Sequence, residues 1–289
     1  MKFEAFRLWR VISGPMLAAV AVLAICMPGM SARAQAQPVK AEQFAWQGEE
    51  LYYSVEVNGA EAARASLRAG EVKNAKGVSY VPISAKAITH GFFAKSYPVD
   101  DNADTYVDPR SLRPIKADKI IREDGKERIY KVRYQPGQFT AEVTRVADKK
   151  EYHYKRAVPG EIHDGLSWLY ELRTKPLKDG DVYDFYVYDG WKLSRLHIKV
   201  VGREKAWTQL KTFDAVKLDI EREVLTSRWN GTAKKRLAPA LQVQQASYYF
   251  ATIHLTDDEA RMPVRVFVTS KMGDSDFKLI KYVEPTKKK

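Results

Sequence analysis

The sequence has very little cysteine, and this limits the ways in which its fold can be held together. Cys26 is the only cysteine in 289 residues, and it lies near the N-terminus. The rest of the chain can form neither a disulfide framework nor a metal site built on thiolates. A hydrophobic core must therefore supply the stability, and the chain is long enough for one large domain.

Motifs of several enzyme classes are also missing. The sequence contains no Gly-x-Ser-x-Gly elbow and no glycine-rich phosphate loop, and its five histidines include no pair at the spacing of metal ligands. His163, Asp164 and Ser167 are close in sequence, but residues so close along one helix cannot form the relay of a hydrolase. We interpret them as a helix start. The prediction is a non-enzymatic protein without catalytic residues, metal or cofactor.

Two acidic segments invite a different interpretation. Residues 100–108 contain four aspartates, but the glycine and the closing glutamate of an EF-hand loop are absent. Asp257, Asp258 and Glu259 could be the acid/base carboxylates of a carbohydrate-active hydrolase. Arg261 and Arg265 lie nearby, so a solvated turn explains these three more simply. We expect both segments to be exposed carboxylates of strand edges and turns.

Long apolar runs are absent except near the N-terminus. Residues 15–30 are almost wholly apolar, follow a basic segment, and precede two small-x-small sites that end at Ala34 and Ala36. This pattern is typical of a secretory signal peptide. Pro28 and Gly29 interrupt the run, which is too short for the roughly 20 residues of a membrane span. We predict a periplasmic protein whose residues 1–36 are cleaved off, with no transmembrane helix in the mature chain.

Cys26 offers an alternative processing site. Residues 23–26, Leu-Ala-Ile-Cys, loosely resemble a bacterial lipoprotein cleavage box, which would attach a lipid to the cysteine. The residue before that cysteine should be small, and Ile25 is not. Cleavage after Ala36 or Ala34 is therefore favoured over a lipid anchor at Cys26.

The charge of the chain is strongly positive. Residues 1–36 contain four Lys or Arg and one Glu, a net +3, so their removal lowers the formal charge from +12 to +9 and leaves 253 residues. Nucleic acid is not an expected partner, because the chain is predicted to be exported and contains no recognised nucleic-acid-binding motif. Anionic envelope components, such as lipid headgroups or acidic glycans, fit the charge better.

The mature chain reads mostly as strands and tight turns. Aromatic and β-branched segments are joined by turn signals such as Asn58-Gly59 and Asp189-Gly190. Two stretches are expected to depart from regular strand: residues 90–98 as an aromatic loop or strand, and residues 227–240 as a polar, basic loop. We predict an all-β, mainly antiparallel fold of roughly 13–15 strands in a large curled sheet, either a half-barrel, a barrel or a sandwich.

One helix is expected, near residues 164–173. Ile162, Leu166 and Leu169 repeat at helical spacing, Asp164 can cap the helix start, and Pro176 ends it. The predicted organisation is a signal peptide at 1–36, a disordered lead-in at 37–45, a single β-rich domain at 46–284 and a basic tail at 285–289.

Several segments together resemble the DUF3108 family of exported bacterial proteins. They are residues 48–53 (Gly-Glu-Glu-Leu-Tyr-Tyr), 108–114 (Asp-Pro-Arg-Ser-Leu-Arg-Pro), 164–173 (Asp-Gly-Leu-Ser-Trp-Leu-Tyr-Glu-Leu-Arg), 200–204 (Val-Val-Gly-Arg-Glu) and 255–264 (Leu-Thr-Asp-Asp-Glu-Ala-Arg-Met-Pro-Val). The resemblance implies an envelope location and a β-rich fold. It assigns no catalytic or binding residue.

These observations favour a protein that binds or chaperones an envelope component, either lipid-like or glycan. A curled sheet can hold an apolar ligand when its inner face is incompletely filled. Trp168, Tyr170 and Arg173 on the expected helix are the candidate ligand-binding residues, as a lid or rim. The alternatives are an envelope scaffold that acts through protein contacts and, less favoured, a carbohydrate-active hydrolase.

Overall fold

A computed structural model describes residues 44–231, 236–270 and 273–286. The predicted signal peptide with Cys26, the first part of the lead-in (37–43) and the end of the basic tail (287–289) lie outside the described residues. Phe44, in the last part of the predicted lead-in, is buried in the core.

Sixteen strands, two α-helices and one 3₁₀ turn make up the described chain. In order they are β1 (Glu50–Val57), β2 (Ala60–Ala69), β3 (Lys73–Ala75), β4 (Val78–Thr89), α1 (Gly91–Ser96), β5 (Asp100–Val107), β6 (Pro114–Glu123), β7 (Lys126–Gln135), the 3₁₀ turn η2 (Pro136–Gln138), β8 (Thr140–Ala147), β9 (Lys150–Ala157), β10 (Ile162–His163), α2 (Ser167–Arg173), β11 (Val182–Tyr188), β12 (Leu193–Trp207), β13 (Thr212–Gly231), β14 (Arg236–Thr256), β15 (Pro263–Ser270) and β16 (Gly273–Val283).

The strands form one continuous sheet that is mostly antiparallel. Its order is β10-β11-β12-β13-β14-β15-β16-β1-β2-β4-β5-β6-β7-β8-β9, with β3 paired to β4. The first and last strands of the chain meet in the middle of the sheet, where Ser54 of β1 lies opposite Lys278 of β16. Among the strand pairs of the described residues, only the short β10–β11 pair is parallel. The predicted all-β curled sheet is confirmed, as a sheet that does not close.

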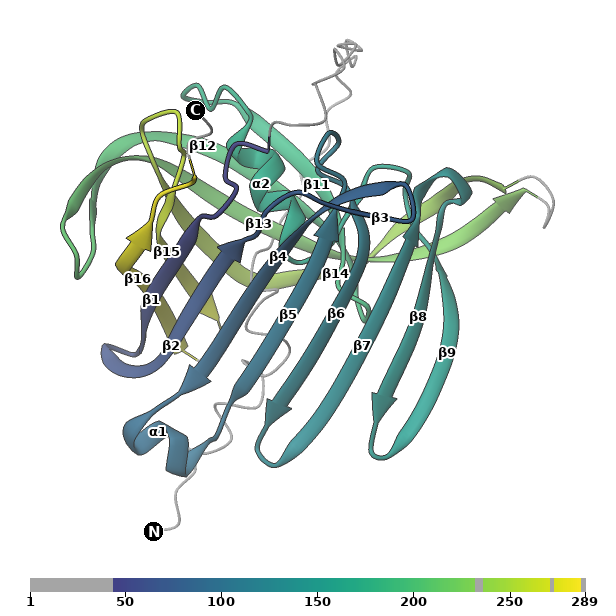
Figure 1. The fold of residues 1–289 in the computed structure, drawn as a ribbon, viewed down its shortest axis with the longest axis horizontal. Coiled ribbons are helices and arrows are strands. Elements are labelled where there is room, and N and C mark those ends of the chain that lie inside the picture. Colours follow the sequence, from purple (N-terminus) through teal and green to yellow (C-terminus); the bar gives the residue numbers. More distant parts are fainter. Residues whose placement is uncertain (1–43, 232–235, 271–272, 287–289) are drawn as a thin grey trace.

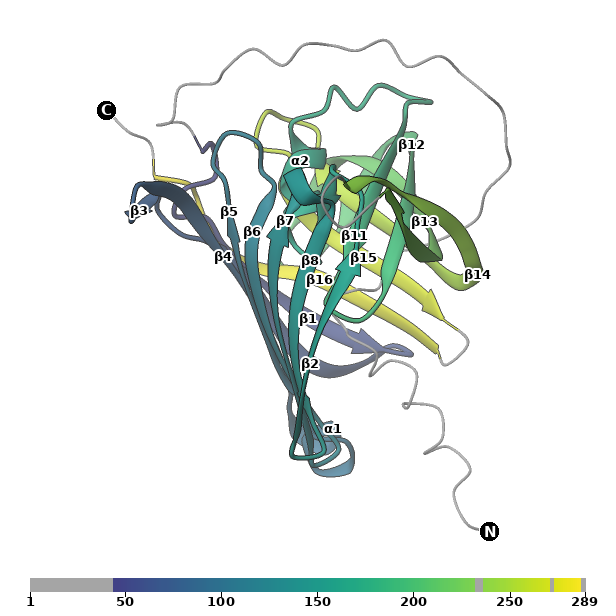
Figure 2. The same ribbon diagram turned by 90° about the vertical axis from the view of Figure 1, so that its right-hand side faces the viewer.

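The sheet curls so that its two ends overlap. Strands β1 to β9 form one broad wall, and β11 to β14 lie behind it (Figures 1 and 2). Neighbouring residues of a strand point to opposite faces. Accordingly, Val187 faces the space enclosed by the curl, whereas Tyr188 packs with Val132 and Val143 of β7 and β8. The inner face of β7 and β8 thus covers the outer face of β11 and β12.

Hydrogen bonds fasten this overlap. Tyr134 on β7 donates its hydroxyl to the carbonyl of Tyr188 at 2.6 Å, and Tyr154 on β9 donates to the carbonyl of Gly190 at 2.8 Å. Ser227 on β13 donates to the carbonyl of Ala157 at 2.6 Å. Side chains rather than strand pairing therefore join the two ends of the sheet.

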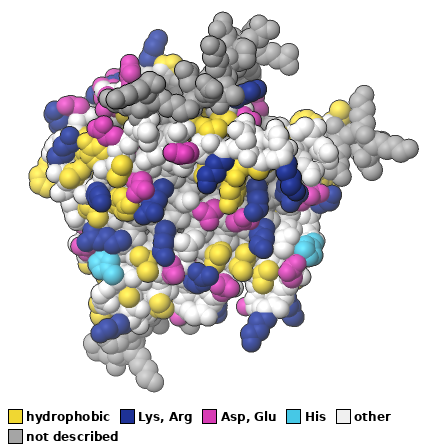
Figure 3. Space-filling view, viewed as in Figure 1, with side chains coloured by type: hydrophobic (Ala, Val, Ile, Leu, Met, Phe, Trp, Pro, Cys, Tyr) yellow, Lys and Arg dark blue, Asp and Glu magenta, His cyan; other side chains and the backbone are white. Residues whose placement is uncertain are grey.

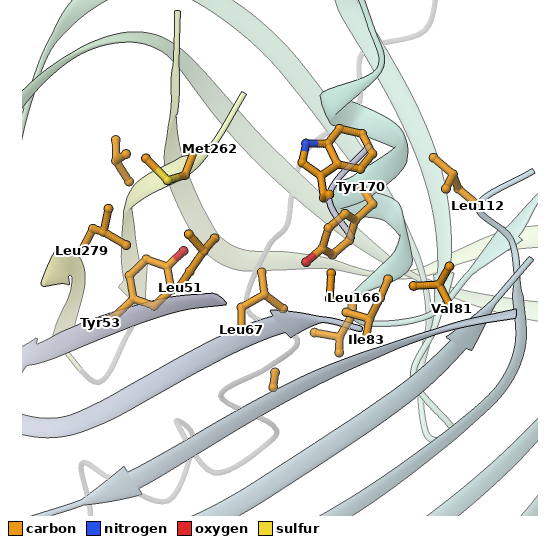
Figure 4. Close-up of a cluster of buried hydrophobic side chains, with 14 of the residues drawn as sticks. Leu51, Tyr53, Leu67, Val81, Ile83, Leu112, Leu166, Tyr170, Met262 and Leu279 are labelled. Atoms are coloured by element: carbon orange, nitrogen blue, oxygen red, sulfur yellow. The ribbon is translucent and has the colours of Figure 1, made fainter. Parts of the chain in front are cut away.

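Helix α2 lies inside the curl at its upper end and divides the core. Leu166 and Tyr170 pack with residues of β1, β2 and β4, and Figure 4 shows them beside Leu67 and Ile83. Trp168 and Leu172 contact a second cluster on β11 to β15. The helix thus braces both walls. Neither helix of the described chain is long and apolar enough to cross a membrane.

Two local expectations from the sequence are wrong. Residues 91–96 form helix α1 rather than a loop or strand. The polar segment 227–240 is largely strand, because β13 and β14 continue as a long hairpin in which Arg228 pairs with Ala240. The register shifts between Arg228 and Asn230, which gives room for Pro239, a residue without an N–H to donate.

Candidate functional site

A cavity of about 160 Å³ lies between α2 and the walls of the sheet. Its apolar lining comes from β1, β2 and β4 on one side, from β11, β12 and β14 to β16 on the other, and from residues 165–169. The larger side chains among them are Tyr53, Leu67, Trp168, Leu196, Ile253 and Phe277. Apolar cavities of about 150 Å³ stay dry and bind small apolar molecules.

Small side chains on β2 and β4 create this space. Ala65 lies opposite Ala87, and Leu67 lies opposite Ala85, so three of these four inward positions carry only a methyl group. All four line the cavity. Larger residues at these positions would let the wall pack directly against α2, as Val81 and Ile83 do farther along β4.

One end of the cavity is polar and rich in cations. Asp189, Lys192, Ser194 and Arg222 line it there. Arg222 is buried and donates from Nε to the Ser194 hydroxyl at 2.7 Å. Lys119 lies next to this group, with its Nζ 3.4 Å from Oδ2 of Asp189. Three cations thus surround one carboxylate.

Asp189 is committed to the protein itself. Its Oδ1 accepts the backbone N–H groups of Trp191 at 2.8 Å and Lys192 at 2.7 Å, which shapes the β11–β12 turn. Burial alone would raise the pKa of Asp189. The charges of Lys119 and Arg222 and these two N–H groups outweigh it and hold the pKa below its usual value. Asp189 therefore stays ionised in the folded protein.

Lys192 differs from the other cations in this group. Its side chain is exposed, and its ammonium has no hydrogen bond or ion pair within the part of the chain that the structure describes. Burial by the cavity wall and the charge of Arg222 lower its pKa, against the opposing effect of Asp189. No carboxylate of the described residues forms an ion pair with the Lys192 ammonium.

The three candidate residues on α2 have separate positions. Trp168 lines the cavity and donates its indole N–H to the carbonyl of Gly165 at 3.1 Å. Arg173 turns away and binds both oxygens of Glu49, at 2.6 and 2.7 Å. Tyr170 is fully buried, with its ring centroid 5.5 Å from that of Trp46. Tyr170 and Arg173 hold the helix in place and do not line the cavity.

His163, Asp164 and Ser167 form the helix start that the sequence indicates. Asp164 accepts the N–H of Ser167 at 2.8 Å, and the Ser167 hydroxyl accepts the N–H of Asp164 at 3.1 Å. His163 lies between Ser167, 3.0 Å from Nδ1, and Arg113, 2.6 Å from Nε2. Burial lowers the pKa of His163, against the opposing effect of the Glu171 carboxylate, whose Oε2 lies 3.0 Å from Nε2. The imidazole is therefore enclosed by Ser167, Arg113 and Glu171. Ser167 is fully buried.

Carboxylates of the two acidic segments form hydrogen bonds and ion pairs within the fold. Oδ1 of Asp258 accepts the N–H groups of Ala260 and Arg261 in a turn, and Asp257 pairs with Arg203 and Arg261. Asp101 is the exception to the expectation of exposed carboxylates, because it is buried on the inner face of β5. Within the described residues, no three His, Cys, Asp or Glu side chains are grouped so as to hold a metal ion.

The sequence analysis missed the cationic end of the cavity, although a signal for it exists. In β13 the residues Leu218 and Ile220 are buried and face inward. By alternation Arg222 must face inward as well. On β6, Lys119 likewise faces inward, because it alternates with the inward-facing residues Ala117 and Ile121. A cation at an inward position of a strand is the pattern to look for.

The comparisons with known proteins concern family and fold. The model of the family "Protein of unknown function (DUF3108)" matches residues 52–280. No curated protein matches the sequence. A crystal structure of a β-barrel-like protein of the domain of unknown function DUF1849, from Brucella abortus, aligns with a TM-score of 0.55 and 11% identity, over 84% of this chain and 100% of that one. This likeness shows a shared fold.

Two further solved structures align over similar lengths. One is described as an exported protein with a YmcC-like fold, from Bacteroides fragilis, with a TM-score of 0.33, 11% identity, and coverage of 82% of this chain and 96% of that one. The other is described as a lipoprotein from Parabacteroides distasonis, with a TM-score of 0.32, 9% identity, and coverage of 82% and 95%.

Proposed function

Because this chain belongs to the DUF3108 family, whose function is unknown, we propose its role from its cavity: it binds a lipid-like envelope component in the periplasm, as a non-enzymatic carrier or chaperone. The observation that carries the proposal is the apolar cavity between α2 and the alanine-lined wall of β2 and β4. Apolar cavities with a few polar groups at one end are typical of small-molecule sites.

The leader sequence supports the location. Residues 1–36 have the basic, apolar and small-residue segments of a signal peptide, and the envelope is where lipid-like ligands need a carrier through water. The outer face of the β1–β9 wall also suits solvent, since Lys and Arg side chains alternate there with Asp and Glu (Figure 3). A ligand would therefore reside inside the curl rather than on this face.

Filling the cavity should abolish binding. Ala65 lines the cavity, whereas Ala60 on the same strand is exposed and does not. We expect Ala65→Phe to weaken binding of a fluorescent fatty acid by about tenfold or more, the equivalent of about 1.4 kcal/mol. Ala60→Phe, which adds the same ring to β2, should leave binding unchanged.

The native ligand can be sought directly. Native mass spectrometry of the protein purified from its own periplasm should show an extractable lipid-like adduct. Ligand-free protein that also fails to bind the fluorescent fatty acid would overturn the proposal. Co-purification of a stoichiometric protein partner, together with that result, would favour the envelope scaffold instead.

A further inference from the structure

The polar end of the cavity contains more positive than negative charge. Lys192 and Arg222 line it together with Asp189 as the one carboxylate there, and Lys119 adds a third cation. Lys86, a further cation among the lining residues, is paired with Asp100 at 3.1 Å. Asp189 already accepts two backbone N–H groups and faces Lys119. Lys192 thus brings to this end of the cavity a charge that no carboxylate of the described residues pairs with.

Lys192 and Arg222 are placed to act together. The charge of Arg222 is close enough to lower the pKa of Lys192, after the larger effect of burial. Arg222 lies opposite the lining residue Leu196 in the β12–β13 pairing and is held in position by its hydrogen bond to Ser194. An anionic group bound beside Lys192 and Arg222 would accept charge-assisted hydrogen bonds from the Lys192 ammonium.

We propose that the ligand is a single-chain amphiphile with an anionic headgroup, a carboxylate or a phosphate, which Lys192 and Arg222 bind at the polar end while the chain occupies the apolar cavity. This inference rests on the proposed function and names the ligand class of the same site. The cavity volume of about 160 Å³ has room for one short chain.

The chemistry at the polar end excludes an uncharged headgroup as the preferred ligand. An alcohol can accept a hydrogen bond from Lys192, but it carries no negative charge to offset that of the ammonium. Hydrogen bonds between charged groups are roughly twice as strong as those between neutral groups. We therefore expect a fatty acid and an alkyl phosphate of the same chain length to bind about tenfold more tightly than the matched fatty alcohol.

Titration calorimetry of the full mature protein with these three compounds tests the inference. Lys192→Met should remove most of the preference for the acid over the alcohol and leave the affinity for the alcohol unchanged, whereas Lys192→Arg should retain the preference. Lys199→Met is the matched control, because Lys199 is exposed on the same strand region but does not line the cavity. It should behave as the unmodified protein.

The outcomes separate the two proposals. Binding of the alcohol as tightly as the acid, or a preference that survives in Lys192→Met, would overturn the anionic headgroup while leaving a lipid-like ligand in place. Failure of all three compounds to bind would contradict the proposed function itself. A stronger response to alkyl phosphate than to fatty acid would support the inference and identify phosphate as the headgroup.

Discussion

Asp101 and Glu123 are buried carboxyl groups whose titration couples stability to pH. They lie on the inner faces of β5 and β6 and are 1% and 4% exposed. Burial, with a contribution from the nearby charge of Asp101, raises the pKa of Glu123 to about 8, although Arg128 forms an ion pair with it. Burial raises the pKa of Asp101 to about 6, against a hydrogen bond from the N–H of Arg122. For both carboxyl groups, the effect of burial on the pKa is larger than the opposing effect of the hydrogen-bond or ion-pair partner.

The free energy of unfolding should therefore fall as the pH rises. In the folded protein Glu123 holds its proton up to about pH 8, whereas in the unfolded chain it has its usual pKa of 4.5. The resulting contribution to stability is therefore complete below pH 4.5 and is lost as the pH rises from 4.5 to about 8. Urea unfolding between pH 5 and 9 should show this decline, and Glu123→Gln should flatten it. The exposed Glu127→Gln on the same hairpin is the control. Parallel profiles for the unmodified protein and Glu123→Gln would contradict the assignment.

Among the elements, α2 depends most on its neighbours. Seven residues are too few for a helix that is stable by itself. Its start is fixed by the reciprocal bonds of Asp164 and Ser167, and its end by Arg173, which binds Glu49 just before β1. The guanidinium also lies 4.5 Å from the ring centroid of Trp46. The helix is thus anchored at both ends, and its position determines how much space remains between it and the walls of the sheet.

Breaking the anchor at the end of α2 should be costly. In Arg173→Met the Glu49 carboxylate stays buried without its partner, so we expect a loss of about 3–5 kcal/mol in the free energy of unfolding. The control is Lys205→Met, whose partner Asp214 is exposed like Lys205 itself, with an expected change of about 0–1 kcal/mol. Urea denaturation measures both. Equal effects of the two substitutions would show that the buried pair is not an anchor.

At the scale of the whole molecule, the overlap of the sheet ends determines the enclosed space. The two ends pack closely at the β11–β12 turn. A Cβ on Gly190 would lie 2.9 Å from Cγ2 of Val132 and 3.2 Å from Cβ of Tyr130. The polar end of the cavity is built on the same turn through Asp189 and Lys192. Any change that separates the sheet ends there should also disturb the ligand site.

Gly190→Ala should therefore destabilise more than the same change at Gly180. Both glycines have positive φ, +89° and +86°, so both alanines carry the same backbone strain, but a Cβ at Gly180 meets no atom within 4 Å. We expect Gly190→Ala to cost about 1–3 kcal/mol more, from overpacking. Hydrogen exchange should show faster exchange of the β11–β12 amides in that variant alone. Equal costs would indicate that the two sheet ends separate without strain.

Particular residues show how far sequence reasoning reaches. In β7, Tyr130, Val132 and Tyr134 are buried whereas Lys131 and Arg133 are exposed, as the alternation of these residue types in the sequence indicates. The strand structure in segment 227–240 was not predictable from the polarity of its residues. Pairing across the β13–β14 hairpin satisfies the hydrogen bonds of the backbone whatever the side chains are. The cationic end of the cavity was missed because its members come from β6, β12, β13 and a turn.

The sequence by itself determined the all-β class, the antiparallel hairpins, the inward and outward faces of most strands and the helix near residues 164–173. These follow from local periodicity and turn chemistry, which act over a few residues. Only the tertiary structure decided that the sheet overlaps rather than closes, that Tyr170 and Arg173 serve as anchors, and that Lys192 and Arg222 meet at one end of a cavity. Those features depend on contacts between residues far apart in the chain, and no local pattern encodes which distant strands will face each other.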